Sequence, residues 1–182
     1  ILAVILSVVI CTILGLVIER VAYRPLRNAS SPLAVLITAI GVSYLLQNVA
    51  LLIWGADTKS FSNVISLPSL KLAGGSIVIT GVTIVTIIGG ILIMAGLMLF
   101  ISKTKTGQAM LAVSEDKGAA QLMGINVNKT ISITFAIGSG LAAIAGVLLC
   151  SAYPSLTPYT GAMPGIKAFV AAVFGGIGSI PG

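Results

Sequence analysis

The sequence predicts an all-α, polytopic integral membrane protein: a helix bundle of four spans and a C-terminal half-helix, with a small β-hairpin in an outside loop. Hydrophobic residues make up 57% of the 182 residues and charged residues only 8%, whereas a soluble domain carries about 25% charged residues. The mean hydropathy is +1.15, and the apolar residues gather in stretches close to the ~20 residues that cross a bilayer. The net charge of +6 comes from basic residues that flank these stretches, as the positive-inside rule expects. We therefore expect a lipid bilayer around this chain, and no nucleic acid.

The first span is expected at residues 1–18, which are apolar throughout. Charged residues follow at once, and Pro25 with a nearby Asn, Ser and Pro cluster favours a short loop over a continued helix. Three arginines place this loop in the cytoplasm; they are Arg20, Arg24 and Arg27.

The second span, at residues 33–54, carries polar side chains in its second half. Ser43 and Gln47 are four residues apart, as are Tyr44 and Asn48, so two adjacent stripes of one helix face are polar. Polar groups in hydrocarbon need partners, so we expect this face to point into the bundle. Hydrogen bonding between helices is the first interpretation of these four residues. The second is that they line a path for a solute.

An outside loop at residues 56–80 precedes the third span, at 81–101. Within the loop, residues 69–79 alternate in polarity on both sides of Gly74 and Gly75. Such alternation around a Gly-Gly pair predicts a β-hairpin.

The only long polar segment, at residues 102–130, predicts a helical elbow on the cytoplasmic side. Two short helices are expected, at 108–113 and 117–123, with Asp116 as the N-cap of the second. Gly124 suits a left-handed residue just after that helix. The fourth span is then expected at residues 131–152.

The last segment predicts a half-helix at residues 164–174, because about eleven residues cross only half of a bilayer. Broken backbone at membrane depth is tolerated only where protein buries it or a water-filled cavity lines it. We therefore count Lys167 and the glycines that follow among the candidate path residues, with a snorkelling role at the interface as the alternative for Lys167. These glycines are Gly175, Gly176 and Gly178.

Nothing in the sequence predicts a catalytic or metal site. The chain has no His, and its four acidic residues lie near span ends or in loops. Cys11 and Cys150 lie far apart in apolar stretches, so we expect both to be reduced. A membrane enzyme would need catalytic groups clustered at one depth, so we expect that the chain is not an enzyme.

Four motifs occur in a fixed order along the chain. They are ERVAYRPLR at 19–27, AIGVS at 39–43 with LQN at 46–48, Gly107 with Ala112, Glu115, Asp116, Ala119, Gly124 and Ile125, and KAF at 167–169 with GGIGSIPG at 175–182. Together they resemble the bacterial high-affinity branched-chain amino acid ABC transporter permeases, H-type subunit. The resemblance covers essentially the whole chain. It implies one transmembrane permease domain over residues 1–182, an internal fragment that lacks N-terminal helices and a C-terminal part.

The resemblance also implies a function and a set of partners. Permeases of this family move branched-chain amino acids across the bacterial inner membrane. They are similar in pairing with a second permease subunit, two ATPase subunits and a periplasmic substrate-binding protein. The chain contains no Walker A sequence, so we expect ATP to be bound by the partner subunits and no cofactor in this chain.

By the same resemblance, residues 102–130 form the cytoplasmic loop that meets the ATPase. Gly118 stands where other ABC importers carry Glu, so a salt bridge from that position is not expected. Small and apolar residues of the second helix suit a cleft on another protein, and acidic residues at the joint cap that helix or meet basic groups of the partner. The expected coupling residues are Glu115, Asp116, Ala119, Ala120, Leu122 and Gly124.

Several alternatives stay open. Urea permeases and other amino acid permeases resemble the same sequences, so the substrate is not fixed by these residues. A passive channel would need no docking elbow. The elbow itself is also consistent with an amphipathic loop lying on the membrane surface.

Overall fold

The structure is a computed structural model that describes residues 2–28, 32–60, 70–72, 77–79 and 81–176. The membrane-spanning helices are α1 (Leu2–Ile18), α2 (Pro32–Trp54), α3 (Gly81–Lys103) and α6 (Val127–Ala152). Among the described residues, four helices are long and apolar enough to cross a membrane, the first of them counted from Leu2 through Tyr23, which confirms the predicted all-α polytopic class. The shorter helices are α4 (Lys105–Glu115), α5 (Lys117–Leu122) and α7 (Ala162–Phe174).

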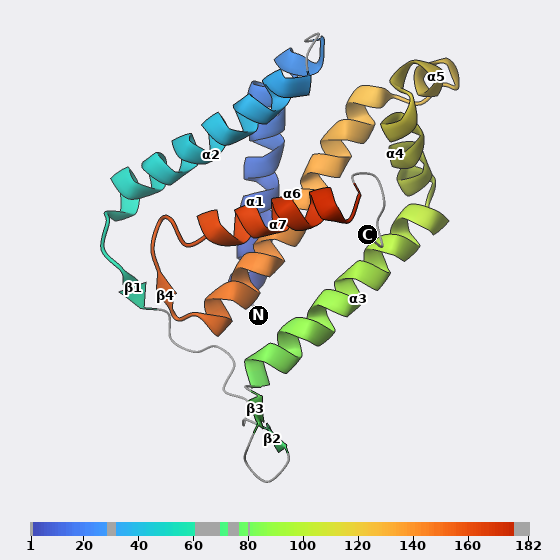
Figure 1. Ribbon diagram of the computed structural model, residues 1–182. Helices are drawn as coiled ribbons and strands as arrows, with labels where there is room; N and C mark the ends of the chain where they lie inside the picture. Colours follow the sequence, from blue (N-terminus) through green and yellow to red (C-terminus); the bar gives the residue numbers. More distant parts are fainter. Residues whose placement is uncertain (1, 29–31, 61–69, 73–76, 80, 177–182) are drawn as a thin grey trace.

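The bundle has two distinct ends (Figure 1). The connection from α1 to α2 and the elbow formed by α4 and α5 lie at one end, and all the strands lie at the other. Strands β2 (Leu70–Leu72) and β3 (Ile77–Ile79) pair antiparallel, which confirms the predicted hairpin. The Gly74-Gly75 turn lies outside the described residues.

A second strand pair was not predicted. Strands β1 (Lys59–Ser60) and β4 (Ser155–Leu156) are antiparallel, with Lys59 opposite Leu156. This pairing joins the loop after α2 to the loop after α6, so the two loops that were predicted to lie outside meet. Two residues in each strand are too few to produce a readable alternation, which explains why sequence alone does not reveal them.

The α-helix of the first span ends at Ile18, as predicted, but the loop predicted directly after it is wrong. Instead of entering a loop after Ile18, the chain continues through a π-helical turn, η1 (Glu19–Tyr23), and only then reaches a 3₁₀ turn, η2 (Pro25–Asn28). The helix can continue because the Glu19 carboxylate has a hydrogen-bond partner inside the bundle. Ser132 Oγ on α6 donates a hydrogen bond to Glu19 Oε2 at 2.9 Å. Glu19 is therefore buried inside the bundle, and the helix does not have to end to expose it.

The most extensive contact between helices, among the described residues, joins α1 to α6. Gly15 faces Ser139 so closely that a Cβ atom at Gly15 would overlap the Ser139 side chain. Farther along, the rings of Tyr23 and Phe135 lie 5.0 Å apart between centroids, within the range of a favourable aromatic pair. These contacts make α1 and α6 the central helix pair, with α2, α3 and α7 around it (Figure 1).

Side-chain caps explain why two helices start earlier than predicted. Helix α6 begins at Val127 rather than residue 131, because Asn126 Oδ1 accepts a hydrogen bond from the Lys129 N–H at 3.1 Å. Helix α4 begins at Lys105 rather than residue 108, because Thr104 Oγ1 accepts from the Gly107 N–H at 3.0 Å. Such caps stabilise a helix start by about 1 kcal/mol.

Candidate functional site

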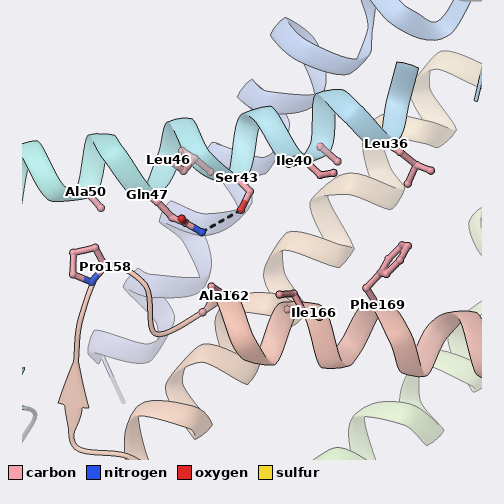
Figure 2. A pocket seen from close by; sticks show the side chains of 13 residues that line it. Leu36, Ile40, Ser43, Leu46, Gln47, Ala50, Pro158, Ala162, Ile166 and Phe169 are labelled. Atoms are coloured by element: carbon pink, nitrogen blue, oxygen red, sulfur yellow. Dashed lines mark hydrogen bonds between the residues drawn. The ribbon is translucent and has the colours of Figure 1, made fainter. Parts of the chain in front are cut away.

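A cavity of about 650 Å³ lies between α2 and α7. Both walls are mainly apolar. The lining includes Leu36, Ile40, Ser43 and Gln47 from α2, and Gly161, Gly165, Ile166 and Phe169 from α7 and the residue before it. Figure 2 shows these two walls facing each other across open space. Apolar lining with a few convergent polar groups is typical of small-molecule sites.

The polar part of the cavity comes from two side chains of α2. Gln47 Nε2 donates a hydrogen bond to Ser43 Oγ at 3.4 Å, within the same helix. Figure 2 shows both side chains on the side of α2 that faces α7. The pair therefore offers amide and hydroxyl groups to a solute in a cavity whose other lining residues are mainly apolar.

The four polar residues predicted on one face of α2 separate into two pairs. Ser43 and Gln47 line the cavity, whereas Tyr44 and Asn48 are not among its lining residues. Asn48 Nδ2 instead donates to the Tyr44 carbonyl at 2.8 Å. Both hydrogen bonds stay within α2, so the interhelical role favoured from sequence has no support among the described residues.

Three of the four C-terminal candidates do not line the described part of the α2–α7 cavity. Lys167, Gly175 and Gly176 are absent from its described lining, and Gly178 lies outside the described residues. Gly176 adopts a φ of +86° just after α7 ends, a conformation that suits glycine. Sequence analysis missed Ile166 and Phe169, whose helical spacing could have indicated a shared face of α7.

The elbow is held by caps at both ends of α5. Asp116 Oδ1 accepts hydrogen bonds from the Gly118 N–H at 2.7 Å and the Ala119 N–H at 3.1 Å, as predicted. At the other end, Gly124 has a φ of +82°, and its N–H and that of the next residue donate to Gln121 and Ala120 carbonyls, each at 3.0 Å. This pattern is a Schellman motif.

The entry to the elbow depends on a close approach between α3 and α4. A Cβ atom at Gly107 would lie only 2.6 Å from the carbonyl oxygen of Phe100. Glycine therefore allows the chain to turn sharply from α3 into α4, and that turn sets the direction of the elbow.

The coupling residues predicted on the elbow are not equally accessible. Leu122 is 91% exposed and Met123 is 82% exposed, so the elbow presents an apolar tip. Ala120 is only 3% exposed, so it packs inside the elbow and, contrary to the prediction, offers almost no surface to a partner. Glu115, Asp116, Ala119 and Gly124 are exposed around the tip.

Comparison with known proteins places the chain in a family. The model of the branched-chain amino acid transport system / permease component family matches residues 1–182. The chain is 45% identical over 180 residues to the high-affinity branched-chain amino acid transport system permease protein BraD of Pseudomonas aeruginosa, covering 97% of this chain and 58% of that protein. It is also 45% identical, over 184 residues and with the same coverage, to the corresponding permease protein LivH of Escherichia coli K12.

A more distant relative shows the same extent of match. The chain is 29% identical over 187 residues to the probable branched-chain amino acid transport permease protein LivH of Methanocaldococcus jannaschii, again covering 97% of this chain and 58% of the relative. The chain thus spans 58% of the length of these relatives. No solved structure matches it.

Proposed function

This chain belongs to the branched-chain amino acid transport system permease component family, and we propose that it forms part of the membrane-spanning subunit of a bacterial ABC importer for branched-chain amino acids. In this proposal the subunit lies in the inner membrane and does not itself hydrolyse ATP. A second permease subunit, two ATPase subunits that bind ATP, and a periplasmic substrate-binding protein complete the transporter.

The α2–α7 cavity supports the proposed substrate class. A branched-chain amino acid has an apolar side chain and a polar backbone end. Apolar walls from Ile40, Ile166 and Phe169 suit the side chain, and the paired hydroxyl and amide of Ser43 and Gln47 suit the polar end.

The exposed tip of the elbow is the observation that carries the proposal. Helix α5 has only six residues, too few to be stable alone in water. The caps at both of its ends hold α5 in a defined orientation, in which the Leu122 and Met123 side chains are exposed. Exposed apolar side chains on a rigid, capped segment are suited to a cleft on another protein, which in this proposal is the ATPase.

The proposal is tested by adding a charge to the tip. Leu122→Asp and Met123→Asp, made in the full-length subunit and reconstituted with all partner subunits, should each abolish substrate-stimulated ATP hydrolysis while the subunit still inserts and folds. A buried, unpaired carboxylate at such an interface costs at least several kcal/mol. Hydrolysis and leucine uptake are measured in the same proteoliposomes.

Tyr153→Asp is the matched control, because Tyr153 is an exposed apolar side chain at the opposite end of α6. It should leave stimulated hydrolysis near the wild-type rate. Full stimulation in both elbow variants would contradict docking and favour a loop on the membrane surface, and uptake without ATP would indicate a passive channel. Competition of leucine uptake by valine, by isoleucine, by other amino acids and by urea separates the proposed substrates from the alternatives.

A further inference from the structure

A separate pocket lies beside the end of α1, and it shares no described lining residue with the α2–α7 cavity. It has a volume of about 550 Å³ and opens between α1, η1 and the first turn of α6. Among the described residues, three basic side chains line it, those of Arg20, Arg24 and Lys129. The proposed transport function gives these side chains no role.

The π-helical turn and a helix start bring the cations together. The Arg24 N–H donates to the Glu19 carbonyl at 2.8 Å, an i→i+5 bond that widens the helix where both arginines line the pocket. Lys129 comes from the first turn of α6, where the helix dipole favours a negatively charged ligand. Asn126 and Asn128 add amide groups beside it.

One acidic group also lines the pocket, and it does not cancel the cations. Glu19 is 3% exposed, and its carboxylate accepts a hydrogen bond from Ser132 Oγ. Arg20, Arg24 and Lys129 are all exposed. A ligand that enters from solvent or from the membrane surface therefore meets three positive charges, while the single carboxylate is directed into the α1–α6 contact.

The rest of the lining is apolar and belongs to the membrane-spanning part of α1. Ile13, Leu16 and Val17 line the same pocket, and they are 56%, 38% and 51% exposed. The pocket thus has a cationic part at the membrane boundary and an apolar part directly along the span. A free anion would use only the first part, whereas a phospholipid would use both.

We propose that this pocket binds the phosphodiester headgroup of an anionic phospholipid, with an acyl chain lying along Ile13, Leu16 and Val17. Basic pockets between membrane helices on the cytoplasmic side are known to hold such headgroups. The bound lipid would lie across the junction of α1 and α6, the most extensive helix contact among the described residues.

The test uses the full-length subunit in its purified complex, in mild detergent. The complex is offered equal amounts of phosphatidylglycerol and phosphatidylcholine with identical acyl chains, and retained lipids are counted by native mass spectrometry. The wild type should retain phosphatidylglycerol in preference. Arg20→Gln, Arg24→Gln and Lys129→Gln should each lower that retention by about fivefold, as expected for one cation near an anionic lipid.

Controls separate charge, folding and the source of the phosphate group. Arg24→Lys should keep the preference, and Lys59→Gln, at the opposite end of the bundle, should leave it unchanged; thermal unfolding verifies that every variant is folded. Inorganic phosphate added at the concentration of the lipid should not displace phosphatidylglycerol. Equal retention of the two lipids, wild-type retention in all three Gln variants, or displacement by inorganic phosphate would each overturn the proposal.

Discussion

At the scale of single residues, α2 offers a comparison between neighbours. Gln47 lines the α2–α7 cavity and Asn48 does not, although both carry amides that hydrogen bond within their own helix. Gln47→Leu should therefore impair leucine uptake, by raising KM or lowering the transport rate about tenfold for one lost polar contact to substrate. Asn48→Leu should change uptake by less than about twofold.

The measurement is initial uptake by proteoliposomes that hold the complete transporter, with ATP hydrolysis recorded in parallel. The two variants make the same kind of change one position apart, so a general effect of an added Leu on folding would affect both. If Asn48→Leu blocks uptake and Gln47→Leu does not, the cavity is not the substrate path.

Individual residues also show where sequence reasoning succeeds. The cap formed by Asp116 and the left-handed Gly124 were predictable, because each depends on a residue type and its nearest neighbours. The burial of Ala120 and the accessibility of Gln47 were not. Both depend on which other helices pack nearby, and an evenly apolar membrane helix gives little indication of which face meets protein and which meets lipid.

At the scale of elements, the α1–α6 contact sets the packing of the bundle. Leu at Gly15 would have to occupy space that the Ser139 side chain already fills. Gly15→Leu should therefore separate the two helices and destabilise the protein by about 1–3 kcal/mol, as overpacking does. The drop should appear in the thermal unfolding temperature of the full-length subunit in detergent.

Gly90→Leu is the matched control, because Gly90 is exposed on α3 and a Cβ there would have no neighbour within 4 Å. Its unfolding temperature should equal or exceed that of the wild type. Equal effects of the two substitutions would mean that the α1–α6 contact does not govern stability.

The contact between α1 and α6 also explains why the loop predicted after Ile18 is not observed. Pro25 and the nearby Asn, Ser and Pro cluster, which closely follow Glu19, predicted a loop instead of a continued helix. The observed helix continues, because Ser132 donates a hydrogen bond to the Glu19 side chain. The two residues are 113 positions apart in the sequence, so sequence alone does not reveal the contact. The spans themselves were predictable from length and hydropathy, since these depend only on the thickness of a bilayer.

At the scale of the whole molecule, the two ends of the bundle differ in charge. The end with the elbow carries Arg20, Arg24, Arg27, Lys103, Lys105, Lys117 and Lys129, whereas the sequence near the strands carries Lys59 and Lys71. Basic residues accumulate on the cytoplasmic side of a membrane protein. We therefore expect the elbow in the cytoplasm and the β1–β4 pair outside.

This orientation is tested with two conservative substitutions in a variant whose Cys11 and Cys150 are replaced by Ala. Ser114 lies on α4 in the elbow and Ser155 lies on β4, and both are exposed. In intact cells, a thiol reagent that cannot cross the inner membrane should label Ser155→Cys and leave Ser114→Cys unmodified; in inside-out vesicles the result should reverse. Labelling of both positions from the same side would contradict the arrangement. Because β4 directly follows α6 and the elbow directly precedes it, that outcome would mean that α6 does not cross the membrane.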